Sequence, residues 1–277
     1  GSKMEMINGD EFDLPSADLA LAVINAKDYD YAVVCVGELP STERPGDIYA
    51  LDLAKEQQEI VKSLSKTGVK IILVLVEGRP KIISEIEPLA DAIIQCYLPG
   101  DQGGTALADI IFGKINPSGK LPYTYPRNSG VIMHYDHKQS ELINGNTWKN
   151  DFFNPQYKFG FGLSYTDYEY SNLVIDKGSY SLSDEINISV DIKNIGERAG
   201  KEVVQLYARD HFATISPALR RLVRYNKVAL NPGETKTVSF RLSTEELGFY
   251  NADNIWINEP GKHSFFVEGL EASFSLK

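Results

Sequence analysis

The sequence predicts a fold of two unlike parts: a partial parallel α/β sandwich followed by an all-β sandwich. Three observations lead to this prediction. Residues 1–125 alternate apolar, β-branched runs with segments of helical spacing. Residues 126–165 show no periodicity and are rich in Pro, Asn, Gly and aromatic side chains, as expected of a long linker or loop. Residues 166–277 then show short segments of alternating hydrophobicity, as half-buried strands do.

The α/β part is predicted to contain three parallel strands with helices between them. The strands are expected at three mostly apolar runs, 31–36, 69–76 and 92–98. The helices are expected where apolar residues recur at helical spacing, around 19–26, 53–64, 82–86 and 105–112. Pro88 is expected to stop the third helix, and Gly113 to close the fourth. This order predicts a doubly wound, flavodoxin-like layer with right-handed crossovers.

A parallel sheet of three strands is thinner than most sheets of its kind. Its uncovered edges would invite pairing with other chains. We therefore expect this layer to be the C-terminal part of a larger domain, with one edge paired to upstream chain. The first residues, Gly1-Ser2-Lys3, are typical of an expression scar, so we expect the natural N-terminus to lie elsewhere.

The all-β part is best marked by the segment 186–193, in which isoleucine and valine alternate strictly with polar residues. Six further strands are expected at 203–209, 222–230, 237–242, 255–257, 264–267 and 272–276. Asn231-Pro-Gly233 supplies a turn between two of them. About seven strands at this spacing, without the Cys…Trp…Cys pattern of antibody domains, predict a fibronectin-III-like sandwich.

Composition excludes several classes of function. The net charge of −10 argues against nucleic acid as a partner, because phosphate binding needs clustered Lys and Arg. No apolar run approaches the roughly 18 residues of a membrane span, so no membrane partner is expected. Two cysteines, Cys35 and Cys96, are too few for a disulfide framework and are expected to be buried free thiols.

No cofactor and no metal site are predicted. The spacing of His134 and His137 occurs in some metal sites, but a third convincing ligand is missing nearby. The glycine-rich segment 100–104 precedes a predicted helix, where a phosphate could bind. It contains no Lys and does not match a Walker motif, so a tight turn is the expected use.

Ionisable side chains concentrate in the segment directly after the first predicted strand. This segment, residues 37–47, is called the acidic loop. It holds three carboxylates and one guanidinium: Glu38, Glu43, Asp47 and Arg44. Ligands of open α/β sheets bind beyond the carboxyl ends of the strands, which is where this loop begins. From the residues alone, Glu43 is either a general acid or a solvated loop charge. Arg79, at the end of the next strand, is expected to brace the loop by bidentate pairing.

Glu38, Asp47 and Arg44 are expected to support this loop or to contact substrate. Glu38 could hydrogen-bond loop amides and hold the turn, although it also rivals Glu43 as the reactive carboxylate. Asp47 follows Gly46 and is expected to anchor the loop or the next helix. Arg44 is expected to pair with one of the carboxylates.

Short motifs follow one another along nearly the whole chain. They are Gly37-Glu…Glu43-Arg-Pro-Gly-Asp47, Gly78-Arg-Pro80, Tyr97-Leu-Pro-Gly100, Gly119-Lys-Leu-Pro122, Phe159-Gly-Phe-Gly-Leu-Ser-Tyr-Thr166 and Leu230-Asn-Pro-Gly-Glu234. Each motif alone is weak, but together and in this order they resemble the C-terminal half of glycoside hydrolase family 3, the β-glucosidase-type enzymes. Ile48 stands where the family often has Arg, and Ala54 where it often has Pro, which puts secondary substrate contacts in doubt.

The resemblance implies the C-terminal portion of a retaining β-glycosidase that hydrolyses O-glycosyl bonds. It implies that Glu43 is the general acid/base, and that the nucleophilic Asp belongs to an N-terminal (β/α)8 barrel absent from this chain. The chain alone is therefore predicted to be inactive, because retaining hydrolysis needs both carboxylates. The implied substrate is a β-linked oligosaccharide or glycoside, and the implied location is periplasmic or secreted.

Two other classes of function are weighed against this one. In a non-catalytic carbohydrate-binding or scaffold module, loop aromatics would stack on sugars: Tyr123, Tyr125, Tyr135, Trp148, Phe152, Phe153 and Tyr157. The same side chains could instead pin the loop onto the domain beneath it. A nucleotide-binding flavodoxin-like domain is disfavoured by the acidic loop and by the missing phosphate motif.

Overall fold

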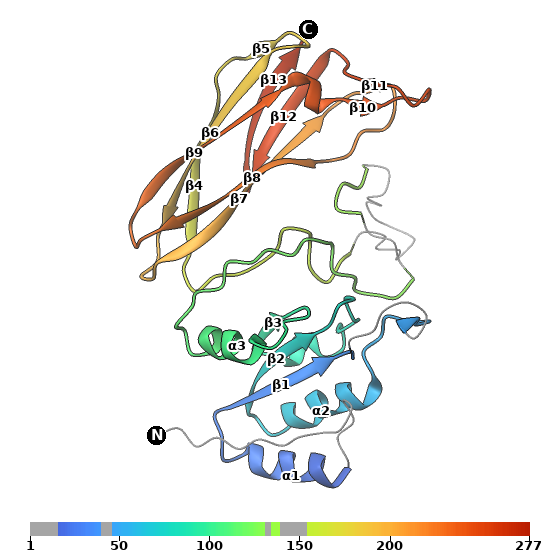
Figure 1. Cartoon of the computed structure of the whole chain (residues 1–277), viewed down its shortest axis with the longest axis vertical. Helices are drawn as coiled ribbons and strands as arrows, with labels where there is room; N and C mark the ends of the chain where they lie inside the picture. The colour runs from blue at the N-terminus through green and yellow to red at the C-terminus, as the bar shows by residue number, and fades with distance from the viewer. Residues whose placement is uncertain (1–15, 40–45, 131–133, 139–153) are drawn as a thin grey trace. The chain divides into compact units, whose positions relative to one another are not determined.

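The computed structural model of the chain describes residues 16–39, 46–130, 134–138 and 154–277 (Figure 1). Within these residues the chain forms two compact units. The first comprises residues 16–112 with 125–130 and 155–157, and the second comprises 113–124, 134–138, 154 and 158–277. Described residues between 113 and 157 therefore contribute to both units.

The first unit is the predicted parallel α/β layer. Its strands lie in the order β1 (Tyr31–Gly37), β2 (Lys70–Val76) and β3 (Ala92–Gln95), and both pairings are parallel. Its helices are α1 (Ser16–Ala26), α2 (Lys55–Ser65) and α3 (Gly103–Ile111). Helix α2 packs against β1 and β2, and α1 lies beside α2 (Figure 1). Parallel pairing brings the carboxyl ends of all three strands to one edge of the sheet.

The apolar pattern explains these elements. On α2, Val61 and Leu64 are buried together with Gln57, as expected for one face of an amphipathic helix. On β2, Ile71, Leu73, Val74 and Leu75 are at most 1% exposed. Such a strand is covered on both faces, which confirms the prediction made from its continuous apolar run.

Two predicted elements of this unit differ in the structure. The helix expected at 82–86 is wrong: Ile82 makes a β-bridge with Asp52, and only a 3-10 helix, η2 (Glu87–Leu89), follows. The backbone of Ile82 is paired with that of Leu51 and Leu53, so it cannot enter a helix. The third strand is shorter than the predicted 92–98. It ends at Gln95, and Tyr97 has a left-handed φ of 54° that breaks the extended conformation.

Strand β1 also corrects a prediction about cysteine. Cys35 is exposed and Cys96 is partly buried, whereas buried thiols were expected. Alternate residues of β1, including Tyr31 and Val33, are exposed on the same face as Cys35. The chain's own described residues leave this face of the edge strand uncovered, so an apolar sequence run did not mean burial here.

The second unit is a β-sandwich. A five-stranded sheet has the order β5 (Ser179–Tyr180), β13 (Leu270–Leu276), β12 (Gly261–Val267), β7 (Gly200–Asp210) and β8 (Arg221–Leu230). A three-stranded sheet has the order β4 (Tyr168–Ile175), β6 (Glu185–Asn194) and β9 (Thr235–Ser243). A 3-10 helix, η4 (Thr244–Leu247), leads into a short hairpin of β10 (Phe249–Tyr250) and β11 (Trp256–Ile257). These strands include the seven predicted positions.

The core of the sandwich lies between its two sheets. On β6, the alternating residues Ile186, Ile188, Val190 and Ile192 are each at most 1% exposed, as their spacing predicts. They pack with buried residues of the other strands in one cluster, including Phe240 and Phe265. Strand β4 was not predicted, because its pairing with β6 is irregular between Ser171 and Val174 and interrupts the two-residue period.

None of the described helices is long and apolar enough to cross a membrane.

Candidate functional site at the carboxyl ends of β1 and β2

The candidate site begins where β1 ends. Gly37 has a φ of 152°, and a Cβ there would lie 1.8 Å from the Val76 carbonyl oxygen, so only glycine fits. Its N–H donates to Gln57 Oε1 at 2.8 Å, and its carbonyl accepts from Gln57 Nε2 at 3.1 Å. The buried Gln57 thereby satisfies both backbone groups at the end of an edge strand. This contact holds the start of the acidic loop against helix α2.

Glu38 forms the centre of a charged cluster at this edge. Its carboxylate accepts from Arg79 Nη2 at 2.7 Å, from Arg79 Nε at 3.1 Å, and from the Arg79 backbone N–H at 2.9 Å. Lys81 Nζ lies 3.2 Å from Glu38 Oε2, and the Lys81 side chain is only 10% exposed. The bidentate pairing expected of Arg79 is therefore present, and its partner is Glu38.

Arg79 also reaches the far end of the acidic loop. Its Nη1 donates to the carbonyl of Gly46. One guanidinium thus contacts the residue that opens the loop, Glu38, and a residue near its end. Glu43 and Arg44 lie between these contacts in sequence but outside the described residues, as does the rest of 40–45. Asp47 is exposed. The pKa of Arg79 is raised mainly by its hydrogen bonds to Glu38, and the negative charges of Glu38 and Asp47 raise it further.

The cluster keeps Glu38 ionised. Burial opposes its charge, but the hydrogen bonds from Arg79 and Lys81 outweigh burial and lower the pKa of Glu38 to about 2. A carboxylate with so low a pKa is a poor general acid near neutral pH. Glu38 therefore serves as a fixed anion that organises its cationic neighbours.

A second carboxyl group, that of Glu77, lies close enough to Glu38 to interact with its charge. Glu77, directly after β2, is 0% exposed. Its Oε1 lies 2.9 Å from the hydroxyl of Tyr125, and its Oε2 accepts from the Lys81 N–H at 3.2 Å. Burial raises the pKa of Glu77 to about 7, although its hydrogen-bond contacts with Tyr125, Lys81 and Gln95 act in the opposite direction.

Sequence reasoning missed Glu77 and Lys81, and it named Tyr125 only as a loop aromatic, without its contact to Glu77. Glu77 follows β2 as Glu38 follows β1, so the rule of carboxyl ends could have found it. Lys81 stands two residues after Arg79 and could have been considered with it. Tyr125 is 48 residues from Glu77 in sequence, and no local pattern marks it.

Replacing Glu38 by Gln should destabilise the α/β unit. At pH 7 we expect a loss of about 1–3 kcal/mol in the free energy of unfolding, because Arg79 and Lys81 lose their anionic acceptor. The Glu38 side chain is 13% exposed, so water replaces these contacts poorly. Because the folded-state pKa lies below the ordinary value of 4.5, this stability is present above about pH 4.5 and is lost as pH falls towards 2.

Urea unfolding at pH 7 and pH 3, followed by circular dichroism at the helical band, measures this effect. All α-helices among the described residues belong to the α/β unit. Glu56→Gln, an exposed change on α2, is the control. Equal stability of Glu38→Gln and wild type at pH 7 would contradict the role given to Glu38.

From the sequence we also considered a metal site, the glycine-rich segment 100–104 and a set of loop aromatics. Within the described residues, no group of three His, Cys, Asp or Glu side chains could hold a metal ion. The glycine-rich segment forms a turn into α3, in which the Gly103 N–H donates to the Gly100 carbonyl at 3.1 Å. Tyr125 and Tyr157 pack edge to face at 5.9 Å. Trp148, Phe152 and Phe153 lie outside the described residues.

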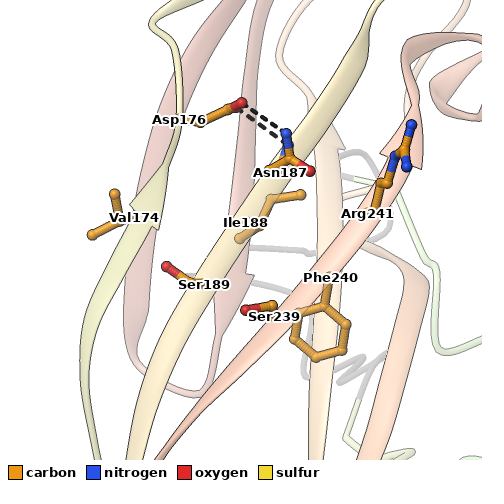
Figure 2. A pocket seen from close by; sticks show the side chains of 8 residues that line it. All are labelled: Val174, Asp176, Asn187, Ile188, Ser189, Ser239, Phe240 and Arg241. Atoms are coloured by element: carbon orange, nitrogen blue, oxygen red, sulfur yellow. Dashed lines mark hydrogen bonds between the residues drawn. The ribbon is translucent and has the colours of Figure 1, made fainter.

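A hollow of about 400 Å³ lies on the sandwich between β4, β6 and β9 (Figure 2). Its lining residues are Val174, Asp176, Asn187, Ile188, Ser189, Ser239, Phe240 and Arg241. Asp176 is the one carboxylate in this lining, and it accepts two hydrogen bonds from Asn187 (Figure 2). A retaining hydrolase needs two carboxyl groups, so this hollow does not suit that chemistry.

Two models of known protein families match this chain. The model of the glycosyl hydrolase family 3 C-terminal domain matches residues 6–165. The model of the fibronectin type III-like domain matches residues 202–270, which confirms the predicted sandwich type.

Relatives match nearly the whole chain. The periplasmic beta-glucosidase of Salmonella typhimurium is 34% identical over 263 residues, which cover 91% of this chain and 34% of that protein. A beta-xylosidase of Formosa agariphila is 36% identical over 259 residues, covering 92% of this chain and 36% of that protein. The solved structure of a Listeria innocua beta-glucosidase in complex with glucose matches with a TM-score of 0.88 at 30% identity. That match covers 97% of this chain and 39% of the Listeria chain. The chain thus spans about a third of the length of these relatives.

Proposed function

The chain belongs to glycosyl hydrolase family 3, and from this membership we propose that it is the C-terminal portion of a retaining β-glycosidase. In this proposal, the loop between β1 and α2 supplies Glu43 as the general acid/base. The nucleophilic carboxylate belongs to an N-terminal (β/α)8 barrel. The chain alone is inactive, because it holds one member of the catalytic pair.

The observation that carries the proposal is the contact of Arg79 with both ends of the acidic loop. Glu38 opens the loop and Gly46 lies near its end, and the Arg79 guanidinium contacts both. A general acid must stay within hydrogen-bond reach of the glycosidic oxygen. A loop held at both ends, and beyond strand ends where ligands of such sheets bind, suits this requirement.

The chemistry follows from the two-carboxylate mechanism. Glu43, when protonated, would donate its proton to the departing glycosidic oxygen as the nucleophile attacks the anomeric carbon. The resulting carboxylate would then take a proton from the water that releases the sugar. Glu38 is unsuited to this cycle because its pKa of about 2 leaves it ionised. Glu38, Arg79, Arg44 and Asp47 instead support the loop or contact the substrate.

The substrate class follows from the relatives. Their names record β-glucosidases and β-xylosidases, and one Listeria structure holds laminaribiose. We therefore propose β-linked glucosides or xylosides, including short oligosaccharides, as substrates of the full-length protein.

A paired assay tests this proposal. The full-length protein should hydrolyse p-nitrophenyl β-glucoside or β-xyloside, whereas the chain of residues 1–277 should release no nitrophenol above the buffer rate. Circular dichroism of the isolated chain is the control for folding. Hydrolysis by the folded, isolated chain at an enzymatic rate would contradict the division of the catalytic pair. Binding of cello-oligosaccharides by the full-length protein, without hydrolysis, would favour the non-catalytic module.

A further inference from the structure

We propose that Glu77 is held as a neutral carboxylic acid and acts as a positioning residue, whose proton fixes Lys81 against Glu38 at the base of the acidic loop. The effect on catalysis rests on the function proposed above. The protonation and its effect on stability do not, because they concern residues of this chain alone.

The first argument counts protons around Tyr125. Its hydroxyl oxygen lies 2.7 Å from the Lys81 carbonyl oxygen and 2.9 Å from Glu77 Oε1. Tyr125 has one phenolic proton, and the carbonyl of Lys81 can only accept. If Tyr125 donates this proton to the closer oxygen, that of the Lys81 carbonyl, no proton of Tyr125 is left for Glu77. The contact between the Tyr125 hydroxyl oxygen and Glu77 Oε1 then needs a proton on Glu77. A protonated Glu77 completes a chain in which Glu77 donates to Tyr125 and Tyr125 donates to Lys81.

The second argument is burial. Glu77 and Tyr125 are 0% and 1% exposed, so water cannot solvate an anion at this position. The groups that face Glu77 are Tyr125, the Lys81 backbone, Gln95 of β3 and the Glu38 carboxylate. Burial raises the pKa of Glu77 to about 7, and the Glu38 charge also disfavours a second anion close by.

The third argument is what the proton holds in place. The N–H of Lys81 donates to Glu77, and the carbonyl of Lys81 accepts from Tyr125. Both backbone groups of Lys81 are thereby fixed, and its ammonium lies 3.2 Å from Glu38. An ionised Glu77 would place a second negative charge near Glu38, and Tyr125 could then donate to Glu77 only by giving up its hydrogen bond to the Lys81 carbonyl. Loss of the proton is thus expected to loosen the cluster that holds the loop.

The protonation is measured directly by NMR titration of the isolated chain with ¹³C-labelled glutamate side chains. Glu77→Gln identifies the signal of Glu77 by its disappearance. We expect that signal to titrate near pH 7, well above the ordinary glutamate value of 4.5. A midpoint at or below the ordinary value of 4.5 would overturn the proposal.

Stability as a function of pH gives a second readout. Between about pH 4.5 and 7, the folded chain keeps a proton that the unfolded chain has released. Wild type should therefore lose thermal stability as pH rises through this window. In Glu77→Gln, the amide NH₂ can donate to Tyr125 while its oxygen accepts from Lys81. This variant should match wild type near pH 4.5 and melt at a higher temperature at pH 8. A lower melting temperature at pH 8 would show that an ionised Glu77 stabilises the fold, and would overturn the proposal.

The pH–rate profile of the full-length protein tests the positioning role. Glu77→Gln should move the alkaline limb of kcat/KM to higher pH, whereas the exposed control Glu56→Gln should leave it unchanged. An unmoved limb would restrict Glu77 to a structural role and refute its positioning role. These outcomes are separable from the role of Glu43, because the NMR and melting experiments do not depend on hydrolysis.

Discussion

In the full-length protein, replacing Glu43 by Ala is expected to lower kcat/KM for alkyl β-glycosides by about 10²–10⁴-fold, the usual contribution of a general acid/base. Aryl glycosides with good leaving groups, such as dinitrophenolate, should lose far less in the bond-breaking step. Their leaving group departs as an anion and needs little help from a proton donor. Steady-state rates across leaving groups of graded pKa measure this difference.

Sodium azide gives an independent check of Glu43. A small anion can enter the space left by the missing carboxylate and attack the glycosyl-enzyme intermediate without a general base. Azide should therefore raise the turnover of Glu43→Ala on activated substrates and yield the glycosyl azide. The exposed Glu56→Ala is the matched control and should behave as wild type. Equal losses on all leaving groups, without azide rescue, would exclude Glu43 as the acid/base.

Replacing Asn194 by Ala is expected to cost about 2–4 kcal/mol in the free energy of unfolding of the sandwich. Asn194 is 0% exposed. Its Nδ2 donates to the carbonyls of Arg198 and Leu230 at 2.7 and 3.2 Å. Its Oδ1 accepts from Thr166 Oγ1 at 2.6 Å and from the Gly196 N–H at 3.1 Å. Alanine would remove all four hydrogen bonds, including those to the buried Thr166 and Leu230.

Urea unfolding followed by Trp256 fluorescence measures this loss, with Trp148 replaced by Phe in every variant. Trp256 lies in the sandwich, on β11. Asn226→Ala, an exposed asparagine on β8, is the control and should change stability by less than about 0.5 kcal/mol. A similarly small effect of Asn194→Ala would mean that water or a rearranged loop replaces its hydrogen bonds.

Asn194 also shows a feature of the core that hydrophobic periodicity does not predict. The alternation of Ile186, Ile188, Val190 and Ile192 predicted one face of β6 correctly, because side chains on a strand alternate between its two faces. Asn194 is the next residue on that face, but its polarity gave no reason to place it in the core. Two of its partners, Thr166 and Leu230, are distant in sequence and come near it only when the chain folds.

The candidate site likewise contains features that the sequence predicts and features that it does not. The contact between Glu38 and Arg79 could be predicted, because each follows one of two consecutive strands and parallel pairing brings their carboxyl ends together. The helix expected at 82–86 was wrong because the backbone of Ile82 pairs with Leu51 and Leu53. That pairing is non-local and has no signature in helical spacing.

The sequence by itself determined the order of the two units, the strands with clear periods, and the acidic loop with its family motifs. These are local properties, since periodicity and turn residues depend on neighbours along the chain. Only the tertiary structure decided which polar groups of the site meet: Arg79 with the Gly46 carbonyl, Lys81 with Glu38, and Glu77 with Tyr125. The protonation of Glu77 depends on burial and on partners distant in sequence, so it could be inferred only after the chain had been folded around it.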